Sequence, residues 1–397
     1  MRVQPSLLIE LQRYGAVDAA ACFDCGTCSA TCPLSSGDDA FPRRMIRYAR
    51  LGKADHLVAS KEVWLCHHCG ECSETCPRQA NPAEFMAAAR RFAIARLDPS
   101  GLSRRLTLSG GFTAATVAVL ALFFAGVLIG RAPRLPDGRF STAGMLHFVP
   151  FAVLHDVGVA LLALLGALAL VILVNMFWTL ARAPVLSGPE PDREPGVFPL
   201  RAALRALGLT LAEVVDHRRQ RTCSAEGPQE PLLLRRWFVH LSIMGGFLGL
   251  GAATALDFLF KDPYADVPPW SPIRLLGILS GLVFTYGTTV ALVRRLRPDR
   301  PTSGTAAQRY YAHTRGPDLV FLFMLWVTAV TGFALTVAIY VPTTSAAWYG
   351  VFLLHVVLAM ELLVLLPFTK FAHAVYRPAA IWFWHFRRLR IPAQPAR

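Results

Sequence analysis

Six long apolar segments dominate the chain from about residue 105 onward. Each holds about 20 or more mostly apolar positions, and they are 106–130, 157–181, 237–256, 275–293, 319–341 and 348–376. A helix rises about 1.5 Å per residue, so roughly 20 residues cross the bilayer core. The pattern therefore predicts a six-helix transmembrane bundle over residues 106–390, followed by a tail at 391–397. The last segment is expected to form one helix that carries Glu361 and Lys370.

Residues 1–105 have a different pattern, in which charged positions alternate with short apolar turns. Apolar residues recur at helical spacing in 41–51 and 82–97. The segment predicts a small, mostly helical soluble domain, so the fold class is mostly α. The first 22 residues carry acidic and polar side chains where a signal peptide needs an apolar core. We therefore expect this domain to stay in the cytoplasm.

Basic residues predict the orientation of the bundle. The chain has 40 Lys and Arg against 26 Asp and Glu, a net charge of +14. Arginines cluster in the gaps 182–236 and 294–316 and after residue 376, and are sparse in the alternate gaps. Positive-inside counting places both termini and the two long loops in the cytoplasm of a multi-pass inner-membrane protein. This distribution indicates membrane topology and no nucleic-acid partner.

One loop contains a further amphipathic segment. Residues 199–217 combine helical apolar spacing with basic positions. They are expected to lie along the cytoplasmic membrane face or to form a solvated linker helix.

Eight of the nine cysteines lie within the first 76 residues, in two runs with the spacing C-x2-C-x2-C-x3-C-P. The first run contains Cys22, Cys25, Cys28 and Cys32, and the second contains Cys66, Cys69, Cys72 and Cys76. This spacing is typical of bacterial ferredoxins with two [4Fe–4S] clusters, in which the fourth cysteine of each run serves the other cluster. We therefore expect one cluster on Cys22, Cys25, Cys28 and Cys76 and the second on Cys66, Cys69, Cys72 and Cys32.

Zinc is the alternative metal, but it favours paired C-x2-C knuckles over triplets followed by C-P. His67 and His68, between the cysteines of the second run, are expected to flank or tune a cluster rather than ligate iron. The ninth cysteine, Cys223, is alone in a predicted loop and is expected to be a free thiol without a redox role.

Four histidines fall inside the predicted spans, where histidine is costly and tends to mark a functional site. They are His155, His240, His355 and His373. His355 and His373 are five helical turns apart, so one continuous helix would present both on one face, about 27 Å apart. The predicted topology places His155 at the outer depth of His355 and His240 at the inner depth of His373. We therefore expect two bis-histidine haems b, one on each pair.

Hydrogen bonding between helices is the alternative role for any of these histidines. His147, eight residues before His155, competes for the outer haem, about 80° around the same predicted helix. His217 and His313 fall in the predicted cytoplasmic loops and are expected at the surface.

Quinone chemistry beside a haem requires a group that exchanges protons. The candidates are His147, Asp156 and Asp257 on the outer side and Glu213, His313 and Lys370 on the inner side. Each has the alternative role of an interfacial charge that reaches water. The substrate is expected to be menaquinone or ubiquinone.

The N-terminal domain resembles the C subunit of heterodisulfide reductase in the segments FPRRMIR (41–47), LG (51–52) and VWLC (63–66). Residues 106–390 are similar to the nitrate reductase gamma-type cytochrome b family, in which a last helix carries two haem-ligating histidines at this wide spacing. Joined in this order, the two parts resemble the QmoC family, membrane subunits of quinone-interacting membrane-bound oxidoreductase complexes. The gamma-type family has five helices with both partner histidines on one, whereas this sequence predicts six helices with the partners on the second and third.

The resemblance implies an oxidoreductase subunit that passes electrons between the quinone pool and cytoplasmic proteins. The implied partners are QmoA- and QmoB-like flavoproteins, similar to the A subunit of heterodisulfide reductase, and adenylylsulfate reductase in dissimilatory sulfur metabolism. The alternative is the membrane subunit of a heterodisulfide-reductase-like or sulfite-pathway complex that delivers quinol electrons to a disulfide. Because eight cysteines are already assigned to clusters, that disulfide chemistry would lie in another subunit. A redox sensor or assembly factor is a third alternative, although no segment resembles an output domain.

Overall fold

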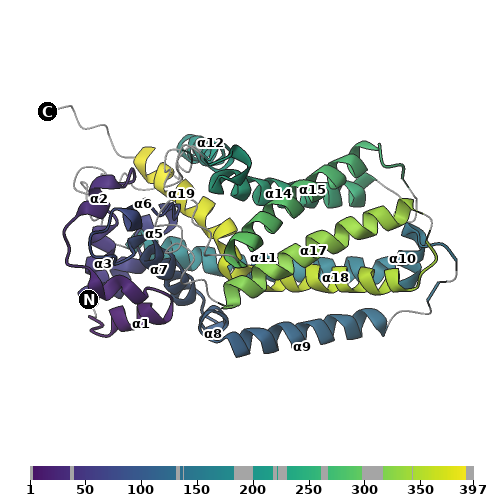
Figure 1. Cartoon of the computed structure of the whole chain (residues 1–397), viewed down its shortest axis with the longest axis horizontal. Coiled ribbons are helices and arrows are strands. Elements are labelled where there is room, and N and C mark those ends of the chain that lie inside the picture. The colour runs from purple at the N-terminus through teal and green to yellow at the C-terminus, as the bar shows by residue number, and fades with distance from the viewer. Residues whose placement is uncertain are drawn as a thin grey trace.

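The computed structural model describes residues 3–35, 40–130, 135–136, 138–182, 200–217, 221, 230–260, 267–296, 316–341 and 343–389. Within these ranges the chain forms helices, turns and loops and contains no strand. The cysteine-rich helices gather at one end of an elongated bundle of apolar helices (Figure 1). The mostly helical fold expected from the sequence is confirmed.

Short helices build the N-terminal domain. They are α1 (Leu7–Arg13), the 3-10 helix η1 (Val17–Ala21), α2 (Thr27–Thr31), α3 (Arg43–Arg50), α4 (Ala54–Val58), α5 (Glu62–Leu65), α6 (Glu71–Glu74) and α7 (Pro82–Leu97). Asn81 caps α7, because its side chain accepts from the Glu84 amide at 3.4 Å and Pro82 occupies the first turn. A helix begins here because both residues satisfy or remove amide donors that the first turn leaves unpaired.

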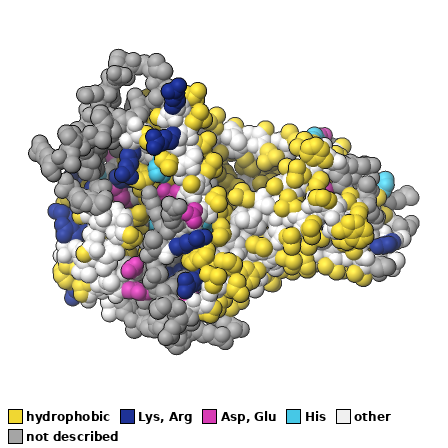
Figure 2. Space-filling view, turned by 90° about the horizontal axis from the view of Figure 1, so that it is seen from above, with side chains coloured by type: hydrophobic (Ala, Val, Ile, Leu, Met, Phe, Trp, Pro, Cys, Tyr) yellow, Lys and Arg dark blue, Asp and Glu magenta, His cyan; other side chains and the backbone are white. Residues whose placement is uncertain are grey.

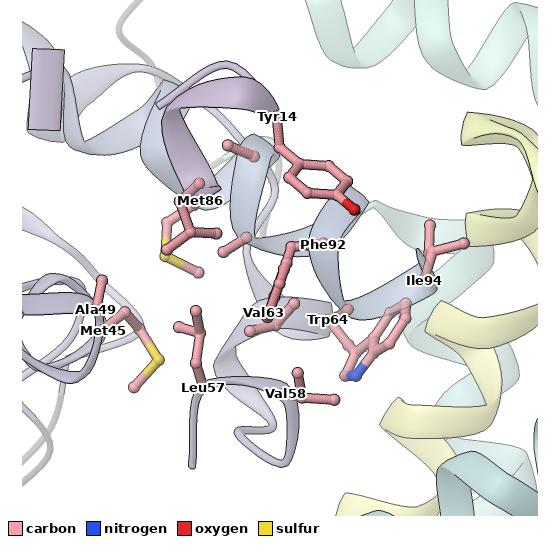
Figure 3. Packing of buried hydrophobic residues seen from close by; sticks show 14 of the residues in the cluster. Tyr14, Met45, Ala49, Leu57, Val58, Val63, Trp64, Met86, Phe92 and Ile94 are labelled. Atoms are coloured by element: carbon pink, nitrogen blue, oxygen red, sulfur yellow. The ribbon is translucent and has the colours of Figure 1, made fainter. Parts of the chain in front are cut away.

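The core of this domain continues into the bundle. Trp64 and Phe92 are fully or almost fully buried in it (Figure 3). The same cluster includes Met176 of α11 (Phe151–Arg182) and Tyr376 of α19 (His373–Leu389), whose ring meets that of Trp64 edge-on at 6.1 Å. Burying a large apolar side chain contributes roughly 1.5–3 kcal/mol, so this shared core holds the two parts in one arrangement.

Six helices are long and apolar enough to cross a membrane. They are α9 (Gly110–Ile129), α11, α14 (Arg236–Phe260), α15 (Pro272–Leu296), α17 (Gly316–Tyr340) and a span over Ala347–Phe368 that begins with α18 (Ala347–Leu365). The short helix α8 (Leu102–Leu108) links α7 to α9, and α10 (Thr142–Phe148) lies at the far end of the bundle (Figure 1). Apolar side chains cover most of the visible bundle surface, and the basic and acidic groups gather toward the cysteine-rich end (Figure 2). These six spans are compatible with a multi-pass membrane protein.

The expectation of one unbroken last helix is wrong. α18 ends at Leu365, two 3-10 turns follow at Leu366–Phe368 and Lys370–Ala372, and α19 starts at His373. Pro367 lies in this break, where it removes an amide donor that a continuous helix requires. His355 and His373 therefore lie on different helices, and His373 lies beyond the apolar span.

The amphipathic segment forms α12 (Leu200–Asp216), which packs on α19 at the cysteine-rich end. Ala203 and Ala206 contact Phe386, and Trp382 Nε1 donates to the Ala203 carbonyl at 3.1 Å. A neighbouring face exposes an apolar stripe of Leu200, Leu204, Leu207, Leu211 and Val215. This stripe favours the membrane-face position over a solvated linker.

Candidate functional site

The two cysteine runs adopt the same local backbone. Asp24 and His68, each just before the second cysteine of its run, have φ values of 66° and 60°. Their amides donate to the sulfurs of Cys22 and Cys66, respectively, at 3.4 Å in both runs. The glycine after each second cysteine also has a positive φ and begins the short helix that carries the third cysteine. Equal spacing in the sequence thus becomes equal geometry in the fold.

Cys28 lies among the thiols expected to share its cluster. Burial raises its pKa to about 11, and the adjacent thiols of Cys22, Cys76 and Cys25 contribute to the increase. Three of these cysteines come from the first run, and Cys76 comes from the end of the second.

Cys32 shows the reciprocal arrangement. Burial raises its pKa to about 12, and its neighbouring thiols are Cys66 and Cys69 of the second run. Burial also raises the pKa of Cys72, which has Cys66, Cys69 and Cys32 around it. The structure therefore places the fourth cysteine of each run beside the other run, as the predicted ligand exchange requires.

The predicted inner histidine pair lines the same cavity as His67 and His68 of the second cysteine run. The ring centroids of His240 on α14 and His373 at the start of α19 lie 6.0 Å apart. Burial lowers the pKa of His373 to about 4, so its imidazole is neutral at physiological pH. A neutral imidazole is the form that ligates iron.

The four predicted haem histidines share one hydrogen-bonding pattern: each forms a hydrogen bond through its Nδ1 atom. The partners are Asp156 Oδ1 for His155 at 2.9 Å, His217 Nε2 for His240 at 3.1 Å, the Thr328 carbonyl for His355 at 3.0 Å and the Lys370 carbonyl for His373 at 2.6 Å. The carboxylate or carbonyl partners of His155, His355 and His373 only accept, so in these three rings Nδ1 carries the proton and Nε2 keeps its lone pair. Metal-binding histidines commonly have this arrangement, so these residues fit haem ligation.

The outer pair is not brought together. His155 stacks on Phe258 of α14, with ring centroids 5.3 Å apart, whereas His355 faces Thr331 and Gly332 of α17. Among the described residues, no contact joins these two rings. His147 lies on α10 and Pro150 separates it from α11, so the expectation that it shares a helix with His155 is wrong.

The prediction that His217 lies at the surface is also wrong. It is 6% exposed and lies directly after α12, with its ring 5.3 Å from that of His240. Burial lowers its pKa, which favours the neutral ring. The missed signal was its position at the end of an amphipathic helix, which brings the chain back to the bundle.

Hydrogen bonds connect the histidine pair to the second cysteine run. Arg377 is one turn after His373 on α19, and its guanidinium donates to His67 Nδ1 at 2.7 Å. Arg236, at the start of α14, donates to the Cys69 carbonyl at 2.7 Å. Both helices that carry the inner histidines thus bind the loop that carries the second cysteine run.

A cavity of about 230 Å³ lies at this junction. Its walls include the four histidines 67, 68, 240 and 373 and the basic residues Arg90, Arg91, Arg295, Lys370 and Arg377. Glu84 and Asp318 are its acidic lining residues, and Phe321 and Phe368 contribute apolar surface. The cavity is thus cationic on balance and touches both the second cysteine run and the His240–His373 pair.

The predicted quinone-site residues are dispersed. Asp156 on α11 is 78% exposed at its side chain, and Asp257 lies on α14. On the inner side, Glu213 accepts from His385 at 3.3 Å between α12 and α19, and Lys370 lines the cavity 3.9 Å from Asp318. His313 and Cys223 lie outside the described residues.

Two known families match the chain. Residues 18–80 match the 4Fe-4S dicluster domain, so the N-terminal domain carries two [4Fe–4S] clusters. Residues 101–392 match citrate utilization protein B. The chain belongs to the citrate utilization protein B family. With two clusters and six apolar spans, this family member has an oxidoreductase-type electron-transfer role.

A curated member of the family is citrate utilization protein B of Escherichia coli, which is 29% identical over 162 residues. The aligned part is 40% of this chain and 39% of that relative, so the chain spans about two fifths of the relative's length. No solved structure matches the chain. The narrower QmoC likeness remains a prediction beside the citrate utilization protein B family.

Proposed function

We propose that the chain is the membrane subunit that carries electrons between a quinone pool and cytoplasmic flavoprotein partners, through two haems b and two [4Fe–4S] clusters. The observation that carries the proposal is the junction between the second cysteine run and the inner histidine pair. The proposed electron path leads from Cys66 to its neighbour His67. From His67 it crosses the hydrogen bond to Arg377 and continues one helical turn along α19 to His373. The proposed ligands of a haem and a cluster are thereby held in one rigid unit.

The exposure of the first cysteine run supports the side from which a soluble partner would approach. Cys25 is exposed, whereas Cys66 of the second run is buried. The adjacent Phe23 is also 56% exposed. A soluble partner therefore reaches the first cluster, and the second cluster lies between it and the membrane.

The histidines support haem as the membrane cofactor. His240 and His373, whose rings meet, would hold the inner haem, and bound haem supplies one-electron redox chemistry. The outer haem is proposed from the sequence on His155 and His355, whose rings the structure does not bring together. Each of the four rings has Nδ1 engaged, which leaves Nε2 for iron. At Gly332, a Cβ would lie 2.7 Å from Cε1 of His355, so the absence of a side chain gives that ring its space.

The cavity supports a quinone site on the inner side. Lys370 is a donor at its wall, and Phe321 and Phe368 offer an apolar surface for a ring. We propose that menaquinone or ubiquinone exchanges electrons here with the inner haem.

The family name supports a partner in citrate utilization, because the relative is named for that process. An enzyme of citrate utilization would then exchange electrons with the clusters and, through them, with quinone. Adenylylsulfate reductase, together with QmoA- and QmoB-like subunits, remains the partner set proposed from the QmoC likeness alone.

The deciding experiment is a reduced-minus-oxidised spectrum of the purified full-length protein, with a haemochrome count and an iron and sulfide analysis. Two b haems, together with their reduction by a quinol, would support the whole conduit. One haem would limit the proposal to a single pair, and the haem content of His240→Ala and His355→Ala would identify it. No haem would overturn the haem and quinone parts.

A further inference from the structure

We infer that His217 is a positioning residue for the inner haem: it orients His240 by accepting a hydrogen bond from Nδ1 of that ring. The inference rests on the proposed function, because it requires His240 to be a haem ligand. His217 contacts the ring of His240 and acts through it.

The hydrogen-bond directions follow from the neighbours of the two rings. His217 Nδ1 lies 3.4 Å from the Val215 carbonyl, which only accepts, so this nitrogen carries the proton. Nε2 of neutral His217 then holds a lone pair, and it lies 3.1 Å from His240 Nδ1. His240 must donate there, and its own Nε2 is left with the lone pair that iron needs.

The backbone at His217 is shaped for this contact. Its φ is 50°, in the left-handed region that side chains other than glycine seldom adopt. Such strain persists where the surrounding structure imposes it, and it is concentrated at functional sites. Here it turns the chain at the end of α12 so that the ring enters the bundle, where only 6% of the residue is exposed.

The same helix supports both sides of the inner pair. α19 begins with His373, and its later residues Trp382 and Phe386 hold α12 through Ala203 and Ala206. α12 in turn delivers His217 to His240. The ligand on α14 and the ligand on α19 are therefore oriented by one connected unit.

A neutral imidazole acceptor also tunes the ligand. Partial withdrawal of the Nδ1 proton makes a ligating imidazole more basic, which favours ferric over ferrous haem. Loss of His217 should therefore raise the midpoint potential of the inner haem and weaken its binding, while the outer haem stays unchanged.

The test is a spectroelectrochemical titration of the full-length protein, with the haem content measured on each variant. His217→Ala should raise one of the two haem potentials and reduce haem affinity roughly 10–100-fold, the usual effect of removing such a partner. His217→Gln, whose amide oxygen accepts a hydrogen bond, should recover much of both quantities. The matched control is His385→Ala, because His385 also lies between α12 and α19 but pairs with Glu213.

Unchanged potentials in His217→Ala would overturn the inference while leaving the haem proposal intact. Equal effects of His217→Ala and His385→Ala on haem potential and affinity would also overturn it, because they would show that His217 acts only by packing α12 against α19. A wild-type protein without haem would overturn the proposed haem function first, and this inference with it.

Discussion

Arg91 on α7 donates to the carboxylate of Asp318 on α17 at 2.9 Å, and this ion pair joins the cysteine domain to the bundle. Arg91 also binds Glu84 at 3.1 Å and the Tyr14 carbonyl at 2.8 Å. Both partners are about 10% exposed at their side chains. Both residues also line the cavity between the second cysteine run and the bundle.

Asp318→Asn should lower the free energy of unfolding by about 3–5 kcal/mol, because it leaves the Arg91 charge buried without its full set of partners. Thermal unfolding in detergent and limited proteolysis between the two domains would measure the change. Asp55→Asn is the control, since the Asp55–Arg96 pair at 3.7 Å is exposed and should contribute about 1 kcal/mol or less. Equal effects of the two substitutions would contradict the role of the buried pair.

Iron content can test whether the fourth cysteine of each run ligates the cluster of the other run. Cys76→Ala and Cys22→Ala should damage the same cluster, so the double variant should keep one cluster. Cys76→Ala with Cys66→Ala should lose both, because these residues belong to different clusters. Iron and sulfide analysis and electron paramagnetic resonance would count them. The reverse result would show that each run closes its own cluster.

Gly332→Ala tests whether the His355 ring is a haem ligand. The added Cβ would lie 2.7 Å from Cε1 of His355, so the imidazole must move. We expect the haemochrome count to fall from two haems to one. Gly350→Ala on α18 is the control, because a Cβ there meets no atom within 4 Å. Two haems in Gly332→Ala would argue that His355 is a structural histidine.

His56 should make the N-terminal domain sensitive to mild acid. Burial, aided by Lys53, lowers the pKa of this imidazole in the folded protein. The unfolded chain, with a histidine pKa of about 6.5, takes up the proton first. The stability linked to this group is therefore present above about pH 6.5 and declines as the pH falls toward the folded pKa.

His56→Gln should flatten that decline between about pH 7 and pH 5. Unfolding midpoints followed through cluster absorbance would measure it. Parallel curves for wild type and His56→Gln would contradict the assignment.

Glu361 is fully buried in α18, and both carboxyl oxygens lack a hydrogen-bond partner among the described residues. An unsatisfied buried polar group costs about 1–3 kcal/mol, so Glu361→Leu should raise the unfolding temperature. Buried ionisable residues in membranes are often functional, so haem reduction by quinol should be measured on the same variant. A destabilised Glu361→Leu would reveal a partner for the acid.

Local patterns were sufficient for the cluster domain and the membrane helices. The spacing of two cysteine runs is a property of a dozen neighbouring residues, and their common turn at Gly26 and Gly70 follows from it. The apolar segments give the six spans because a helix satisfies its own backbone wherever lipid surrounds it. Even the end of α18 had a local signal in Pro367, which a count of apolar residues overlooks.

Depth in the membrane predicted two histidine pairs, and the structure brings together only His240 and His373. His240 and His373 approach because α19 turns away from α18 and packs beneath the second cysteine run. His217 joins them because α12 docks on α19, a contact between segments almost 180 residues apart. The sequence alone determined the spacing of the cysteine runs and the six spans, since these depend on near neighbours and on lipid. Only the tertiary structure decided which imidazoles meet and what lines the cavity, because those contacts arise from packing between distant helices.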